Sequence, residues 1–77
     1  MRLPRNEGGQ ELAKRLERLG YHFVRQVGSH MRLSDGANRL TVPDHRPVRV
    51  GTLNKILRKV EEQKGLTREE VLKTLWG

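Results

Sequence analysis

Apolar residues recur along the chain with two different periods, and the change between them separates helices from strands. In residues 10–19 the apolar side chains Leu12, Leu16 and Leu19 are spaced at i, i+4 and i+7, which is typical of one helix face. Gly20 then suits the left-handed position that ends many helices. The spacing therefore predicts a first helix over residues 10–19.

After this helix the period falls to two, as it does in strands. Residues 21–27 are rich in aromatic and β-branched side chains, and residues 29–34 and 39–42 alternate between apolar and polar. Residues 35–37 form a turn signal, and Pro43 suits the end of an edge strand. The pattern predicts a three-stranded antiparallel meander with one apolar face and one polar, arginine-bearing face.

Two more helices are predicted after the strands. One begins near Gly51 and ends at Gly65, and a capping box over residues 67–70 begins the other. The stripe that the first of these buries consists of Leu53, Ile56, Leu57 and Val60. The apolar stripes of this helix and of the first helix, over residues 10–19, can be buried only against the apolar face of the sheet. The predicted fold class is therefore α+β and double-stranded-RNA-binding-domain-like: a three-stranded antiparallel sheet with two helices on one face (α-β-β-β-α) and a short C-terminal helix.

A length of 77 residues is enough for one domain and too short for two. We expect a single domain over residues 1–77, with residues 1–9 as an unpatterned lead and residues 66–77 as an added helix. The chain has no cysteine, which excludes a disulfide framework and a thiolate metal site. Its apolar runs are too short to span a bilayer and its first residues do not resemble a signal peptide. These features predict a cytoplasmic protein without a membrane partner.

Positive charge is concentrated in the middle of the chain. Sixteen Lys and Arg against nine Asp and Glu give a net charge of +7. Residues 21–60 hold eight basic and two acidic residues and so carry +6, whereas residues 1–20 contribute +2 and residues 61–77 contribute −1. Such a field attracts polyanions, because each neutralised phosphate releases condensed counterions. The charge favours a nucleic-acid partner over a basic surface that only contacts water.

His30 is the strongest candidate for chemistry. It follows a Gly-Ser turn and is expected on the polar face of its strand beside Arg32, with Arg39 on the same face of the next strand. A free imidazole has a pKa near 6.5, so it exchanges protons at neutral pH. Beside guanidinium groups that hold a phosphate, it can deprotonate a ribose 2′-hydroxyl or protonate the leaving oxygen. An exposed histidine near a turn, without a catalytic role, is the alternative interpretation.

The other two histidines carry less information. His45 follows the third strand, where it is a second proton-transfer group, a phosphate contact, or a loop residue at the entry of the second helix. His22 has no special context. The acidic residues are isolated in loops or lie on helix surfaces, so we expect no metal site and no cofactor. Tyr21 and Phe23 are expected in the core, which leaves no aromatic platform for base stacking.

Four short elements follow one another within residues 10–65. They are Gly20-Tyr21, Arg25-Gln26-x-Gly28-Ser29-His30, Val42-Pro43-x-His45 and Gly51-Thr52-Leu53-x-x-Ile56-Leu57. In this order and spacing they resemble the HicA toxin family. The resemblance implies a double-stranded-RNA-binding-like fold, ribosome-independent cleavage of mRNA, and silencing by a HicB-type antitoxin protein. It also implies that His30 is the catalytic histidine and that His45 is a second histidine of less defined role.

The chain departs from the family pattern at three places: Met31 stands where a second histidine is common, residues 1–9 are extra, and Trp76 ends an added helix. Met31 argues against a site built from two adjacent histidines.

Together, residues and resemblance predict a metal-independent endoribonuclease that uses His30 as general acid or base. The expected RNA contacts are polar or basic and lie on the strands, the turn and the second helix: Arg25, Ser29, Arg32, Arg39, Lys55, Arg58 and Lys59. A non-catalytic RNA-binding module, or a toxin that has lost its activity, is the main alternative. A DNA-binding regulator that acts only with its antitoxin is a third.

Overall fold

A computed structural model describes residues 3–77. Its elements in chain order are α1 (Gly9–Leu16), a 3₁₀ turn η1 (Glu17–Leu19), β1 (His22–Val27), β2 (His30–Ser34), β3 (Arg39–Pro43), α2 (Val50–Lys64) and α3 (Arg68–Trp76). This order confirms the predicted α+β fold with its added C-terminal helix. Within residues 3–77, none of the helices combines the length and the hydropathy that a transmembrane span needs.

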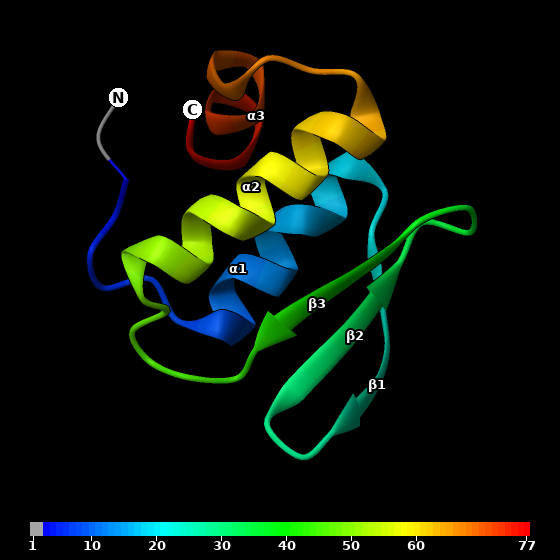
Figure 1. Ribbon diagram of the computed structural model, residues 1–77, viewed down its shortest axis with the longest axis vertical. Coiled ribbons are helices and arrows are strands. Elements are labelled where there is room, and N and C mark those ends of the chain that lie inside the picture. Colours follow the sequence, from blue (N-terminus) through cyan, green and yellow to red (C-terminus); the bar gives the residue numbers. More distant parts are fainter. Residues whose placement is uncertain (1–2) are drawn as a thin grey trace.

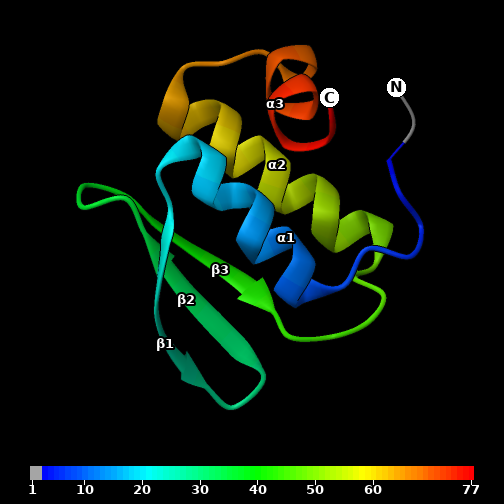
Figure 2. The ribbon, with the colours of Figure 1, turned by 180° about the vertical axis from the view of Figure 1, so that it is seen from behind.

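The molecule has two layers, with helices on one face of the sheet (Figure 1). α1 and α2 lie side by side and pack against β3, and α1 also contacts β1. α3 packs on α1, α2 and η1. Seen from behind, the hairpin of β1 and β2 projects away from the helices (Figure 2). The helices thus cover one face of the sheet and leave the other accessible.

The core contains the residues that the periodicity selected. Leu53, Ile56, Leu57 and Val60 of α2 are all buried, and β2 and β3 bury Met31, Leu33, Leu40 and Val42. Helix ends also follow the predicted signals: Gly20 and Gly65 have positive φ angles at the ends of η1 and α2. At the start of α3 the Thr67 hydroxyl accepts a hydrogen bond from the Glu70 amide, and the Glu70 carboxylate accepts one from the Thr67 amide.

The sheet has the order β1-β2-β3, and both pairings are antiparallel. Between β2 and β3 the register is regular, with Arg32 opposite Thr41. Between β1 and β2 a bulge follows Phe23, so that Phe23 is opposite Leu33 but Arg25, not Val24, is opposite Arg32. Strict alternation would direct Arg25 toward the helices. The bulge instead places it on the accessible face.

The expectation that Phe23 belongs to the core is wrong. Tyr21, which precedes β1, is fully buried, but the Phe23 side chain is 54% exposed, and all six residues of β1 are exposed. The physical reason is the position of the strand: β1 is an edge strand, and the hairpin that it forms with β2 extends beyond the helices. Contrary to the expectation from the sequence, an exposed aromatic side chain is therefore free to contact a base.

Candidate functional site

The face of the sheet that the helices leave uncovered, here called the open face, carries the predicted polar residues. Along β2 and β3 exposed and buried residues alternate, and His30, Arg32, Arg39 and Thr41 are on the exposed side. Because their buried neighbours fill the core, the orientation of these side chains is set by the packing on the other face. The predicted location of His30 on the solvent face of the second strand is confirmed.

His30 and His45 line the same depression, although they are distant from each other in sequence. This depression, the histidine depression, has a volume of about 590 Å³. Its other polar lining residues come from β3 and from the start of α2: Thr41, Arg49 and Thr52. Arg49 precedes the first turn of α2, and its side chain does not cap that turn. Backbone N–H groups at such a helix start attract anions, so the depression combines two imidazoles with groups that favour a phosphate.

Backbone hydrogen bonds hold the segment that carries His45. The Gly9 amide donates to the His45 carbonyl oxygen at 2.9 Å, and the Val48 amide donates to the Glu7 carbonyl oxygen at 2.7 Å. A Cβ atom on Gly9 would lie 1.9 Å from the Pro43 carbonyl oxygen, so only glycine allows this close approach. The segment before α1, which showed no sequence pattern, therefore positions the second candidate histidine.

Glu7, in the same segment, is a buried acidic residue with 5% exposure. Its carboxylate accepts hydrogen bonds from Arg15 Nε at 2.6 Å and from Trp76 Nε1 at 3.5 Å. The Arg15 guanidinium also donates to the Leu75 carbonyl oxygen and lies over the Trp76 ring. We call Glu7, Arg15 and Trp76 the clamp. It ties the segment that holds His45 to the C-terminal helix.

The far end of β2 is also fixed by a paired acid. Lys64 Nζ contacts an Asp35 carboxylate oxygen at 2.5 Å, and Asp35 further accepts hydrogen bonds from Asn38 and from the Ala37 amide. These bonds, the one from Lys64 foremost, lower the pKa of Asp35. Burial and the nearby Asp35 charge raise the pKa of Tyr21 to about 12. The β2–β3 turn is thereby anchored to the end of α2.

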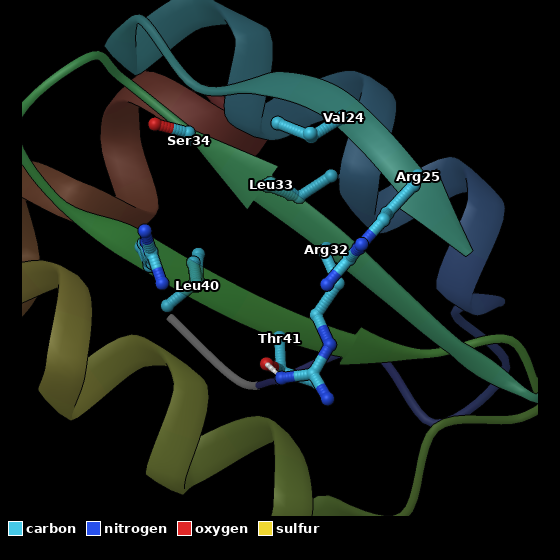
Figure 3. Close-up of a pocket in the computed structure, with 8 residues that line it drawn as sticks. Val24, Arg25, Arg32, Leu33, Ser34, Leu40 and Thr41 are labelled. Atoms are coloured by element: carbon cyan, nitrogen blue, oxygen red, sulfur yellow. Dashed lines mark hydrogen bonds between the residues drawn. The ribbon is translucent and has the colours of Figure 1, made fainter. Parts of the chain in front are cut away.

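Two further depressions adjoin the histidine depression. One, of about 470 Å³, is lined by Arg25, Arg32 and Arg39 and is called the arginine depression (Figure 3). The other, of about 300 Å³, lies between β3 and α2 and includes Lys55 and Lys59; we call it the lysine groove. Thr41 lines all three. Six cationic side chains therefore border one continuous surface around His30: Arg25, Arg32, Arg39, Arg49, Lys55 and Lys59.

These cations lack acidic partners. Residues 3–77 contain four salt bridges, formed by Arg15, Arg46, Lys64 and Arg68, and none involves a cation of the depressions. Arg25 is directly opposite Arg32 across the β1–β2 pair, an arrangement of like charges that costs stability. Arg32 donates to the Thr41 hydroxyl at 3.2 Å. An anionic ligand would neutralise this cluster.

The structure does not gather every predicted contact. Arg58 is exposed but lines none of the three depressions, and Ser29 is likewise outside them. The carbonyl oxygen of Ser29 instead accepts a hydrogen bond from the Asp44 amide. Arg49 and Thr52, which sequence reasoning did not include among the site residues, line the histidine depression. Their position directly before and within the first turn of the second predicted helix was the signal that could have identified them.

Comparison with known proteins gives one result. The family model described as the HicA toxin of bacterial toxin–antitoxin systems matches residues 9–61. That range includes the whole sheet, both candidate histidines and most of α2. No curated protein and no solved structure matches the chain.

Proposed function

The chain belongs to the HicA toxin family of bacterial toxin–antitoxin systems, and on that premise we propose that it is an endoribonuclease that cleaves mRNA without the ribosome and without a metal ion. One observation carries the proposal. His30 and His45 line a single depression, and the cations that surround it have no acidic partner among residues 3–77. The site thus offers proton transfer and phosphate binding together.

The proposed reaction is attack of a ribose 2′-oxygen on the adjacent phosphorus. As the new P–O2′ bond forms, the 2′-proton passes to a neutral imidazole. The P–O5′ bond breaks, and a protonated imidazole gives its proton to the departing 5′-oxygen. The products are a 2′,3′-cyclic phosphate and a 5′-hydroxyl, so atoms and protons balance without a co-reactant. We assign one of these proton transfers to His30, with His45 as the candidate for the other.

In this proposal the cations near His30 stabilise the charge on the phosphate. Negative charge builds up on the non-bridging phosphate oxygens during the attack, and donors that are already in place stabilise it without reorganisation. Arg32, which lines the adjoining arginine depression, and Arg49, which lines the histidine depression, are such donors. The unfilled hydrogen-bonding capacity at the start of α2 supports the same role.

We further propose that the partner is a HicB-type antitoxin protein and that both act in the cytoplasm, where mRNA is found. A net charge of +7 favours an acidic partner surface, since charge complementarity steers association. An antitoxin that covers the open face would block His30 directly. A structure of the complex in which the open face stayed accessible would require inhibition by another route.

The experiment is cleavage of a single-stranded oligoribonucleotide by purified protein in the presence of EDTA. Two substrates are compared, one all-ribose and one with a single 2′-deoxy nucleotide at the cut position. We expect the first to be cut to 2′,3′-cyclic phosphate ends and the second to resist cutting at that position. Cleavage that needs added Mg²⁺, or cutting that tolerates the 2′-deoxy substitution, would contradict the proposed chemistry. Binding without cleavage would instead favour the non-catalytic RNA-binding module.

A further inference from the structure

Two exposed valines stand on the open face among its cations. β2 and β3 present only polar or small side chains there, but β1 presents Val24, 60% exposed, and Val27, 48% exposed. Val27 is directly opposite His30, and Val24 lines the arginine depression. An antiparallel sheet with one solvated face normally alternates apolar-in with polar-out, so these outward valines depart from the pattern.

The bulge in β1 produces this arrangement. Without it, Arg25 would be opposite the buried Met31 of β2 and would point toward the helices, and Val27 would be on the same side of the strand as Arg25. With it, Val24 and Arg25 both border the arginine depression, as Figure 3 shows, and Val27 is beside His30. Bulges often redirect side chains next to functional sites. The extra residue thus brings Arg25 and Val27 onto the face that carries the candidate catalytic histidine, where Val24 also lies.

A single-stranded nucleic acid has the complementary pattern. Its phosphates are charged, whereas the faces of its bases are apolar and pack on apolar or aromatic side chains in a largely sequence-tolerant way. Arg32 is two residues from His30 along β2, about 7 Å at the rise of a strand. The arginine depression therefore begins two residues along β2 from the candidate catalytic residue, His30.

We propose that the arginine depression is a nucleotide subsite next to the cut position of an RNA strand, an inference that rests on the proposed function. The phosphate of this nucleotide lies between Arg25 and Arg32, which relieves the repulsion of the two opposed guanidinium groups. Its base packs on Val24, and Val27 extends the apolar surface toward His30. Part of the affinity for RNA then comes from apolar contact with a base and does not depend on charge.

The test measures binding in a His30→Ala background, so that the RNA stays intact. Two probes are used: a fluorescent single-stranded oligoribonucleotide and inorganic polyphosphate, which has the charge without the bases. The variants are Val24→Thr, Val27→Thr and the pair, all of which keep a β-branched side chain at an exposed position. Val50→Thr is the matched control, because Val50 is 46% exposed in the first turn of α2 and lines none of the three depressions.

We expect each valine change on β1 to weaken oligoribonucleotide binding by about fourfold, since a methyl group is lost from an apolar contact. Polyphosphate binding and the slope of log Kd against log salt concentration stay unchanged. Arg25→Gln, by contrast, lowers that slope by about one for both probes. Val24→Ile, which enlarges the apolar contact, should bind the oligoribonucleotide at least as tightly as the parent protein.

Three results would overturn the subsite. One is unchanged oligoribonucleotide affinity in the paired valine variant, which would leave these valines as a surface for a protein partner. Another is an equal loss for both probes, which would show that the valines act on the phosphate contacts. The third is an equal loss in Val50→Thr. If the parent His30→Ala protein binds neither probe at low salt, the proposed function itself fails, and that result differs from all three.

Discussion

Arg15 of the clamp and Arg32 of the open face differ in what surrounds them. The Arg15 guanidinium has the buried Glu7 carboxylate, the Leu75 carbonyl oxygen and the Trp76 ring as partners. Arg32 has one hydroxyl, from Thr41, and an arginine opposite it. A charge that is satisfied within the chain contributes to the fold, whereas a cluster of unsatisfied charges is stable in water but favours a ligand. The contrast separates the side chains that hold the structure together from those that are available to an anionic ligand.

The same contrast appears in the two groups of basic residues on α2. Lys55 and Lys59 border the lysine groove without acidic partners, whereas Lys64 at the end of the helix is paired with Asp35. One helix thus contributes both to the candidate RNA surface and to the anchoring of the β2–β3 turn. Lys64 differs because it is the last residue of α2 and lies beside Asp35.

Among the effects on binding and stability, the largest is expected from reversing charge in the lysine groove. Lys55→Glu with Lys59→Glu should weaken binding of a single-stranded oligoribonucleotide by roughly tenfold to a hundredfold and lower the salt slope by about two. Helicity should change little, because both side chains are exposed and lie outside the buried stripe of α2. Fluorescence polarisation over a range of salt concentrations measures both quantities.

The matched control for this experiment is Arg58→Glu with Lys73→Glu, which makes the same change in net charge outside the three depressions. We expect a clearly smaller loss of affinity. Equal losses in the two double variants would mean that net charge alone governs binding, and the distinction between paired and unpaired surfaces would lose its functional meaning.

The next effect concerns the clamp. Glu7→Ala removes the partner of Arg15 and of the Trp76 indole, and we expect it to lower the free energy of unfolding by about 1–3 kcal/mol. For a domain of this size that corresponds to a fall in melting temperature of roughly 4–8 °C per kcal/mol. Hydrogen exchange of the Gly9 and Val48 amides should become faster, because they bond to the segment that Glu7 fixes. Glu17→Ala, at an exposed position of η1, should change neither quantity.

The smallest effect is a decrease in the stability of the fold at acid pH. Because the pKa of Asp35 is lowered in the folded protein, its pairing with Lys64 stabilises the fold above the unfolded pKa of about 3.9. That contribution is lost as the pH falls through the folded pKa, so stability should decrease in this acid range. Asp35→Asn keeps a side-chain acceptor for the turn but removes the charge, and it should flatten this part of the curve. Parallel curves of melting temperature against pH for both proteins would contradict the assignment.

The fold was largely predictable because it depends on local patterns. The i, i+4 spacing of Leu12 and Leu16 and the alternation of Met31 and Leu33 need only a helix period and a strand period, and these residues are all buried. The bulge was not predictable, since β1 reads as a regular strand and the extra residue is defined only by pairing with β2. The exposure of Phe23 was not predictable for another reason: alternation does not show that β1 is an edge strand whose hairpin extends beyond the helices.

The candidate site was predictable only in part. His30 was located by alternation, which is local, and its location is confirmed. That His45 lines the same depression depends on the path of residues 44–49, which is fixed by hydrogen bonds to the segment before α1. Glu7 gave no signal, because a single glutamate among polar residues is not distinguished until its arginine and tryptophan partners are placed. Sequence patterns are local, so they do not predict contacts between segments that are distant in the chain.

The central claim is that proton transfer on the open face depends on His30. The most direct measurement is the single-turnover rate of oligoribonucleotide cleavage for His30→Ala, His45→Ala and His22→Ala, compared at equal circular dichroism and melting temperature. His22 is the matched control, because it is exposed on the same sheet but is paired with Ser34, which is four residues and about 13 Å along β2 from His30.

We expect His30→Ala to lower the rate by a factor on the order of 10²–10⁴ and to abolish growth arrest while RNA affinity stays within a few fold. His45→Ala should lose less, and His22→Ala should cut at the wild-type rate. The His30 substitution opens no cavity, since the side chain is exposed. A folded His30→Ala protein that cleaves RNA at the wild-type rate would contradict the account.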